Sequence, residues 1–138
     1  MESATESTTT RLPKAEQRKL DSHHLRDPLL DELANDLPFF SEDALQLLKF
    51  HGSYQQDDRD KREKGKDKTW QMMLRLRSPA GRIPAQLFLA MDDLSNRLGD
   101  GSLRATTRQA FQMHGIPKGD LKEVNGTIVE NMGSTLAA

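Results

Sequence analysis

Residues 103–116 read LRATTRQAFQMHGI, a run in which two arginines, a glutamine and a histidine fall at even-numbered positions. In an extended chain, residues two positions apart lie on the same face. If no turn interrupts the run, one face carries Leu103, Ala105, Phe111 and Met113, and the other carries Arg104, Arg108, Gln112 and His114. Because guanidinium groups bind carboxylates and oxyanions well, the run predicts strands that bury one face and offer the other to an anionic ligand.

The flanking patterns indicate how these strands fit into a fold. Residues 70–77 alternate as a strand does, and residues 84–99 have the apolar stripe and final glycine of a helix. A second helical stripe covers residues 121–132. With two strands, or one bent strand, in residues 103–116, the order is β-α-β-β-α. We therefore predict an α+β, ferredoxin-like half-domain whose last strand is missing, which leaves one sheet edge without a partner.

The sequence before residue 69 has a different organisation. Residues 1–24 are polar and lack periodicity, so we expect a disordered tail. Residues 25–68 are expected to form a helical arm and a charged loop, and residues 69–138 the half-domain. In the arm, Asp27-Pro28 and Ser41 begin two short helices, and residues 49–56 form a loop. Because 11 of the 12 residues at 57–68 are charged, this segment is predicted to be solvated.

Composition limits the classes of function. The chain has 138 residues, no cysteine and no apolar run long enough to cross a membrane, which excludes disulfides, thiolate nucleophiles and cysteine-ligated clusters within it. The first ten residues do not resemble a secretory signal, and we expect a cytoplasmic protein without a membrane partner. Residues 1–60 carry 7 Lys/Arg and 13 Asp/Glu (−6), whereas residues 61–138 carry 13 and 8 (+5). An anionic partner is therefore expected at the second half.

The cationic face has two interpretations. Arg75 and Arg77 share a face of their predicted strand and, with Arg104 and Arg108, supply four guanidinium groups for a polycarboxylate or an oxyanion. The alternative is the solvated face of a half-exposed sheet. His114 is a candidate proton donor, anion contact or metal ligand, or a structural residue. No metal site is predicted, because the other histidines bring no second and third ligand, and nucleic-acid binding is disfavoured because the strands lack interleaved aromatic residues.

Three motifs together carry a resemblance to a known family: KFHGSYQQDDRD (residues 49–60), MLRLR (73–77) and LRATTRQAFQMHGI (103–116). In this order and spacing they resemble the N-terminal part of assimilatory sulfite reductase, whose members contain sirohaem and a four-iron–four-sulfur cluster. The resemblance covers residues 25–138. PAQLFLAMDDL (84–94) is more similar to the ferredoxin-dependent branch than to the NADPH-linked haemoprotein, and His114 with the KFHG motif favours sulfite reductases over the related nitrite reductases.

The resemblance implies roles for individual residues. Arg104, Arg108, Gln112 and His114 match family positions that line the sirohaem, whose eight carboxylates require cations. Arg75 matches an arginine beside the substrate anion. The implied activity is the six-electron reduction of sulfite to sulfide, with ferredoxin as the electron donor. The cofactor supplies the redox chemistry, and these residues supply binding and electrostatics.

The chain departs from the family pattern in one large respect. It has none of the four cysteines that bind the iron–sulfur cluster in the family, and it lacks the active-site lysines and the further arginine that the family carries later in the sequence. We therefore expect a fragment that is inactive by itself and whose partner is the missing C-terminal part of the reductase. The alternatives are a segment of a ferredoxin-nitrite reductase and a non-catalytic module that binds anions or tetrapyrroles.

Overall fold

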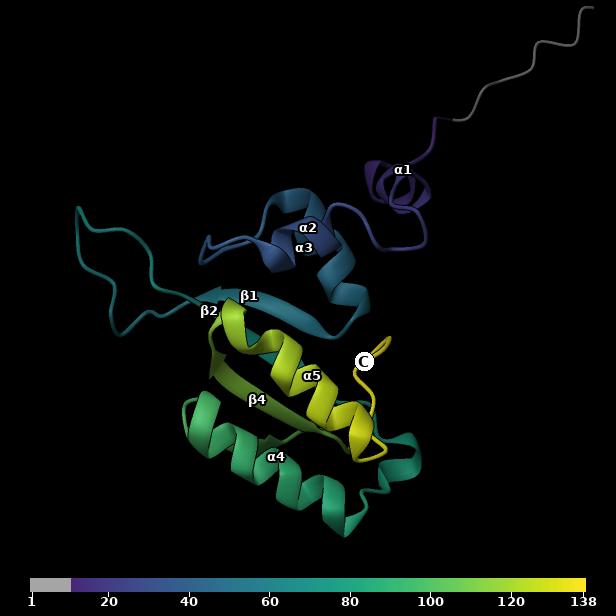
Figure 1. Cartoon of the computed structure of the whole chain (residues 1–138), viewed down its shortest axis with the longest axis vertical. Coiled ribbons are helices and arrows are strands. Elements are labelled where there is room, and N and C mark those ends of the chain that lie inside the picture. The colour runs from purple at the N-terminus through teal and green to yellow at the C-terminus, as the bar shows by residue number, and fades with distance from the viewer. Residues whose placement is uncertain (1–10) are drawn as a thin grey trace, which may run out of the picture.

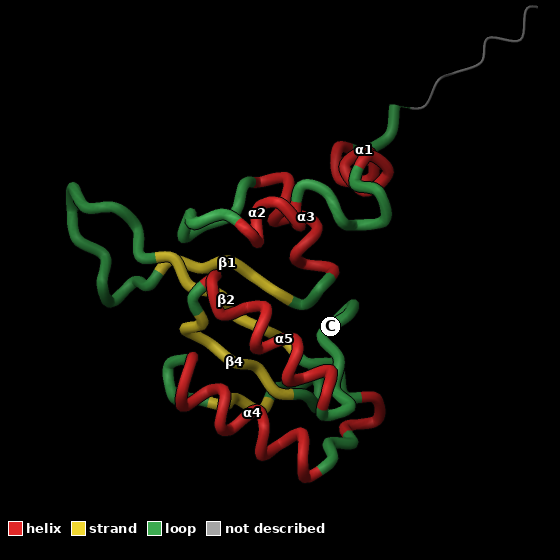
Figure 2. The backbone as a smooth tube through the Cα atoms, in the orientation of Figure 1, coloured by secondary structure: helices red, strands yellow, loops and turns green. Residues whose placement is uncertain are grey.

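The structure, a computed structural model, describes residues 11–138. Its centre is a four-stranded antiparallel sheet in the order β1 (Ser53–Asp57), β2 (Trp70–Arg75), β4 (Phe111–Ile116) and β3 (Leu103–Ala105). The helices that contact the sheet lie on one of its faces, whereas α1 (Lys14–Asp21) packs against α3 (Glu42–Phe50) (Figure 1). The same arrangement is visible in the backbone trace, where the two long helices lie in front of the strands (Figure 2). Short 3-10 turns occupy Pro79–Gly81 and Lys118–Asp120. The main elements are α1 (Lys14–Asp21), α2 (Leu29–Ala34), α3 (Glu42–Phe50), β1 (Ser53–Asp57), β2 (Trp70–Arg75), α4 (Ala85–Leu98), β3 (Leu103–Ala105), β4 (Phe111–Ile116) and α5 (Leu121–Glu130).

The predicted α+β, ferredoxin-like class is confirmed, but one sheet edge differs from the expectation. From β2 onward, the elements follow the predicted order β-α-β-β-α. The edge next to β2 is not vacant, because β1 pairs with it antiparallel from Ser53 opposite Leu74 to Asp57 opposite Trp70. The prediction of a loop at residues 49–56 is therefore wrong for most of that segment. The strand was missed because its sequence, SYQQD, is polar and shows no apolar alternation.

The N-terminal region also differs in part from the expectation. Lys14–Asp21 forms α1, where a tail without secondary structure was expected. Residues 1–10 of the expected tail lie outside the described residues. Both short helices of the arm are present, and the hydroxyl of Ser41 accepts a hydrogen bond from the N–H of Ala44 (3.3 Å). This bond satisfies one of the free donors at the start of α3, as expected for a capping serine.

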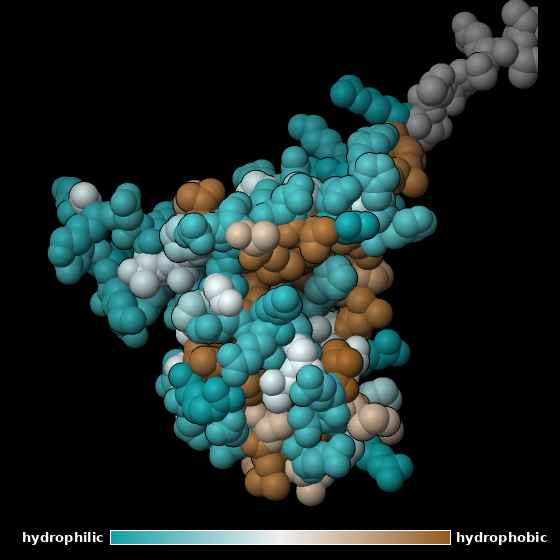
Figure 3. Space-filling view, viewed as in Figure 1, coloured by the Kyte–Doolittle hydropathy of each residue, from teal (hydrophilic) through white to brown (hydrophobic). Residues whose placement is uncertain are grey.

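The core lies between the helices and the covered face of the sheet. The apolar stripes of α4 and α5 face the sheet, as their spacing predicted. The second stripe is shorter than predicted, because α5 ends at Glu130 and Met132 is exposed. No helix within residues 11–138 has the length and apolar character needed to cross a membrane. Apolar side chains also remain visible between the helical arm and α5, where Leu29, Leu33 and Val129 line a groove (Figure 3). The fully buried core side chains include Leu47, Met72, Leu74, Met91, Leu94, Met113, Ile116, Leu121, Val124 and Ile128.

A buried cation joins the helical arm to the half-domain. The ammonium group of Lys118 donates hydrogen bonds to the side-chain oxygen of Asn35 (2.5 Å) and to the carbonyl of Leu37 (2.9 Å). It also lies 4.7 Å from the centre of the Phe40 ring. Burial lowers the pKa of Lys118, although nearby acidic side chains oppose this shift. The arm is therefore attached to the sheet both by this lysine and by the β1–β2 pairing.

The charged segment extends from the β1–β2 hairpin into solvent (Figure 1). Residues 59–68 are all exposed, as predicted for a solvated loop. Neighbouring charges of opposite sign pair with one another, which limits the net field of the loop. The pairs are Arg62 with Asp57, Lys61 with Asp58 (3.3 Å) and Lys66 with Glu63 (2.6 Å).

Gly126 lies inside α5, where the fold does not require a glycine. A Cβ at this position meets no atom within 4 Å, and the residue is exposed. Gly126→Ala is therefore expected to raise the free energy of unfolding by about 0.5–1 kcal/mol, because alanine loses less backbone entropy in a helix. Urea denaturation of both chains measures the change. An unchanged or lower midpoint would contradict the prediction.

Candidate functional site

One face of the sheet carries most of the predicted site residues and, among the described residues, no helix covers it. Arg75 of β2 and Arg104 of β3 both lie opposite Gln112 of β4 in the antiparallel register. Directly opposed residues point to the same side of a sheet, so these three polar side chains form a row across three strands. His114, two residues after Gln112, shares this side. We call this surface the open face; from β1 and β2 it also includes Tyr54, Gln56, Gln71 and Met73.

Arg108 is the exception to the predicted alternation. A turn at residues 106–110 separates β3 from β4, so the prediction that Arg108 lies on the strand face, which depended on the absence of a turn, is wrong. Thr106 closes the turn, since its N–H and its hydroxyl both donate to the carbonyl of Ala110 (3.0 Å each). The turn nevertheless brings Arg108 next to the open face, where it lines one pocket together with Arg75 and Gln112.

A β-bulge at Gly115 lies beside His114. The register pairs on its two sides are Leu74 with Met113 and Met72 with Ile116, so β4 has one extra residue here. Gly115 has a φ of 76°, and a Cβ at this position would lie 2.9 Å from the backbone nitrogen of Asp100. Only glycine fits both constraints without strain. Bulges change the direction of neighbouring side chains and are frequent beside binding sites.

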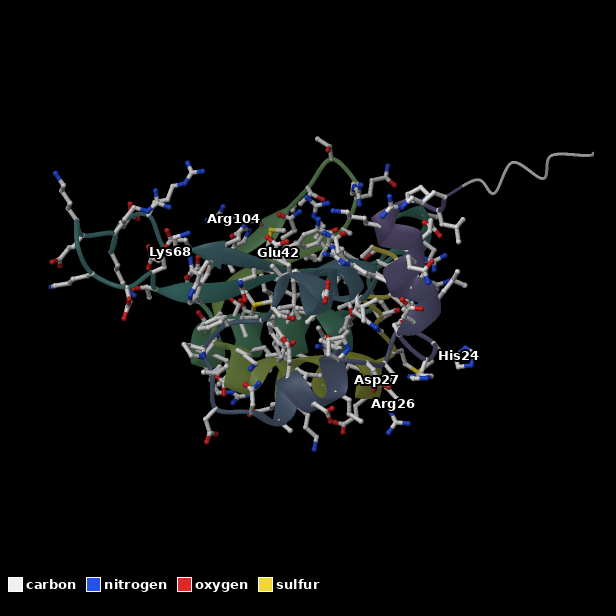
Figure 4. All side chains as sticks on the ribbon, turned by 90° about the horizontal axis from the view of Figure 1, so that it is seen from above. His24, Arg26, Asp27, Glu42, Lys68 and Arg104 are labelled. Carbon is white, nitrogen blue, oxygen red and sulfur yellow. The ribbon has the colours of Figure 1, made fainter. Side chains whose placement is uncertain are left out.

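The predicted site residues are divided between two hollows of the open face. The first, which we call the arginine pocket, is lined by Arg75, Arg77, Arg108 and Gln112, by neighbouring residues of the segments 75–79 and 106–112, and by residues 137–138. The second, which we call the histidine basin, is lined by Arg104 and His114, by Gln56, Gln71 and Asp100, and by the first residues of the charged loop. In the view from above, Arg104 lies on the same side as Lys68 at the base of that loop (Figure 4).

The three arginines of the arginine pocket form no ion pair among residues 11–138. Arg75 is half-buried, and its Nε atom is buried without a hydrogen-bond partner. Its guanidinium carbon lies 4.9 Å from the centre of the Tyr54 ring, a cation–π contact that restricts the side chain. Within residues 11–138, Arg75, Arg77 and Arg108 have no carboxylate within 4.0 Å. The pocket is therefore suited to an anion.

Tyr54 is a residue of the site that the sequence did not identify, and Arg77 reaches the site differently from the prediction. Tyr54 belongs to β1, which was expected to be a loop, so its contact with Arg75 had no signal in the pattern. Arg77 was predicted as one of four guanidinium groups on the strands, but it lies two residues beyond the end of β2. Its position in the pocket depends on the turn at residues 106–110, which brings Arg108 towards it.

In the histidine basin, the imidazole of His114 lies near the carboxylate of Asp100. Burial lowers the pKa of His114, and the nearby charge of Arg104 lowers it further, while Asp100 opposes the shift. The Nε2 atom of His114 is buried without a hydrogen-bond partner. Burial tends to raise the pKa of Asp100, but hydrogen bonds from the N–H (2.8 Å) and hydroxyl (2.6 Å) of Ser102 outweigh it, so the net shift is downward.

The depressed pKa of His114 predicts a pH dependence of stability. An unfolded histidine gains its proton near pH 6.5. The folded state gains it at lower pH, so the unfolded state binds more protons as the pH falls below about 6.5, and the stability contributed by neutral His114 is lost. We expect His114→Gln to lose less unfolding free energy than the wild-type chain between about pH 7.5 and 5.5.

Chemical denaturation at each pH provides the measurement. His24→Gln is the matched control, because His24 is exposed and lies at the far end of the molecule (Figure 4). Equal pH dependence of the wild-type chain and His114→Gln would rule out this role for His114.

The donors of the open face fit a ligand with several carboxylates. Unpaired guanidinium groups, the amide of Gln112 and the buried Nε2 of His114 are all potential donors to carboxylate oxygens. Within residues 11–138, no three His, Cys, Asp or Glu side chains are grouped to bind a metal ion.

Several known proteins are similar to this chain in sequence. A family model described as the nitrite/sulfite reductase ferredoxin-like half domain matches residues 63–131, which is half of the chain. The chain is 57% identical over 128 residues to the sulfite reductase (ferredoxin) of Synechococcus elongatus, which covers 93% of this chain and 20% of that protein. It is 48% identical over 128 residues to the sulfite reductase (NADPH) hemoprotein beta-component of a Paenibacillus species, covering 89% and 22%.

The fold is shared with a solved structure as well. The NirA protein of Mycobacterium tuberculosis superposes with a TM-score of 0.72 at 18% identity, over 93% of this chain and 26% of that chain. This chain spans about a fifth of the length of the curated relatives that it matches. The family predicted from the three motifs is confirmed: the chain belongs to the nitrite/sulfite reductase ferredoxin-like half-domain family.

Proposed function

We propose that this chain is a segment of a sirohaem-dependent sulfite reductase of the ferredoxin type, and that its open face binds the cofactor carboxylates and the substrate anion. The observation that carries the proposal is the row of Arg75, Gln112 and Arg104 across three strands, on a face without helices among the described residues. The higher identity to the ferredoxin-type relative, 57% against 48% for the NADPH-type relative, supports the choice of ferredoxin as electron donor.

The proposed roles follow the environment of each residue. Arg104, Arg108, Gln112 and His114 bind carboxylates of sirohaem, and when bound, sirohaem supplies the redox chemistry that reduces sulfite to sulfide. A carboxylate that accepts a hydrogen bond from Nε2 of His114 raises the pKa of this histidine, because an opposite charge favours the protonated form. The imidazole then binds the carboxylate by a charge-assisted hydrogen bond.

Arg75 is proposed to bind the substrate anion. Its guanidinium is half-buried and restricted by the Tyr54 ring, so less side-chain entropy is lost when an anion binds. A guanidinium group also binds oxyanions through two-point contacts. Arg75 therefore provides a fixed positive charge in the arginine pocket.

The iron–sulfur cluster that the family uses has no thiolate ligand in this chain, which contains no cysteine. Electron delivery to sirohaem therefore requires residues outside these 138. We expect the purified chain to produce no sulfide from sulfite with either reduced ferredoxin or methyl viologen. Turnover by the chain alone would contradict the proposed role.

A chimeric enzyme tests the proposal directly. The segment of the Synechococcus sulfite reductase that matches this chain is replaced by this chain, and the parent enzyme is the control. We expect the chimera to contain sirohaem, measured by absorbance, and to reduce sulfite with reduced ferredoxin. A folded chimera that contains the iron–sulfur cluster but no sirohaem would overturn the proposal.

A further inference from the structure

Three arginines approach the arginine pocket from two separate segments. Arg75 ends β2, Arg77 follows two residues later, and Arg108 comes from the turn at residues 106–110. The family resemblance gives roles to Arg75 and Arg108 but none to Arg77. The position of Arg77 in the same pocket is therefore an independent observation of this structure.

The backbone of Arg77 is fixed, whereas its side chain is free to bind a ligand. Its N–H donates a hydrogen bond to the carbonyl of Ser134 (2.8 Å), and the preceding N–H of Leu76 donates to the carbonyl of Phe111 (3.0 Å). The side chain of Arg77 is exposed and, within residues 11–138, lies more than 4.0 Å from any carboxylate oxygen. The backbone of Arg77 is thus held in place, while its guanidinium group forms no ion pair with the described residues.

We propose that Arg77 is a third anion-binding residue of the arginine pocket and shares an anion either with Arg75 or with Arg108. Like charges that line one pocket repel one another, and a bound anion removes this repulsion. Guanidinium forks bind the oxygen atoms of carboxylates and oxyanions in two-point contacts, so one anion with two or more oxygens can satisfy several arginines. The identity of that anion rests on the proposed function: a cofactor carboxylate or the substrate oxyanion.

Sulfate binding to the chain itself tests the site without the cofactor. The wild-type chain is titrated with sodium sulfate at constant ionic strength, and backbone amide shifts are followed by NMR. We expect shifts concentrated at residues 75–79 and 106–112 and a dissociation constant about three to ten times higher in Arg77→Gln. Arg82→Gln is the matched control, because Arg82 is exposed in the same loop but does not line the pocket.

The outcomes separate this inference from the proposed function. The inference would be wrong if Arg77→Gln bound sulfate as tightly as the wild-type chain. It would also be wrong if sulfate shifted amide signals of the wild-type chain only outside the arginine pocket. Both results are independent of the experiment with the chimera. In the chimera, a lower sirohaem content of Arg77→Gln identifies the anion as a cofactor carboxylate, whereas a higher KM for sulfite at full sirohaem content identifies it as the substrate. Unchanged content and KM, with melting temperatures equal to that of Arg82→Gln, would also contradict a role for Arg77.

Discussion

Gly52→Ala is expected to destabilise the chain by roughly 3–5 kcal/mol, the largest effect on stability that we predict for a single methyl group. Gly52 has a φ of 69°, a left-handed conformation that costs alanine about 1–2 kcal/mol. A Cβ at this position would also lie 2.8 Å from the carbonyl oxygen of Arg75 and closer still to that of Thr135. Both obstacles are backbone atoms, so neither moves aside easily.

The contacts around Gly52 explain why a backbone shift that relieves this clash would also disturb the arginine pocket. The carbonyl of Gly52 accepts a hydrogen bond from the N–H of Arg75 (2.8 Å), and the carbonyl of Phe50 accepts one from the N–H of Ala137 (2.7 Å). A shift of the Gly52 backbone therefore disturbs the end of β2, where Arg75 enters the arginine pocket. We expect loss of stability and loss of anion binding to occur together.

Gly65→Ala is the control that measures the cost in unfolding free energy of the left-handed backbone conformation alone. Gly65 has a φ of 87° in the exposed charged loop, and a Cβ there meets no atom within 4 Å. Its substitution is expected to cost about 1–2 kcal/mol, the strain alone. Urea denaturation of both variants measures the difference, which is the contribution of the clash. Equal destabilisation by the two substitutions would show that no clash exists at Gly52.

The sequence predicted the fold where apolar periodicity was strong. The stripes of α4 and α5 and the alternation of β2 indicated a half-buried sheet, and these elements formed as expected. β1 was missed because an edge strand gains its stability from backbone hydrogen bonds with its neighbour, which leave no mark on the side-chain pattern. For the same reason the sheet edge beside β2 was wrongly expected to be unpaired.

The site was predictable only as far as its strands were regular. Arg104, Gln112 and His114 share a face as their even numbers predicted, because they lie within β3 and β4. Arg108 does not, because the turn at residues 106–110 interrupts the alternation, and the bulge at Gly115 returns Ile116 to the core in spite of its even number. The convergence of Arg77 and Arg108 depends on tertiary structure and has no local sequence signal.

Arg108→Ala in the chimeric enzyme is expected to reduce sirohaem occupancy strongly. In the proposed complex, loss of this guanidinium leaves a cofactor carboxylate without its partner, at a cost of roughly 2–5 kcal/mol. This corresponds to at least about a thirtyfold weaker affinity for the cofactor. Absorbance of the purified enzyme reports sirohaem content. Arg82→Ala, outside the pocket, is expected to retain the content of the unmodified chimera.

Arg75→Ala is expected to impair sulfite reduction while leaving sirohaem content unchanged, the opposite of Arg108→Ala. Its half-buried guanidinium, stacked on Tyr54, is proposed to bind substrate rather than the cofactor. The variant should therefore retain sirohaem but bind and reduce sulfite poorly, seen as a higher KM and lower kcat in steady-state kinetics with reduced ferredoxin. If the open face is instead only a solvated sheet surface, Arg75→Ala, Arg108→Ala and Arg82→Ala will show the same small effects on cofactor content and turnover. A large difference between Arg75→Ala and Arg108→Ala is expected only if the two arginines bind different anions.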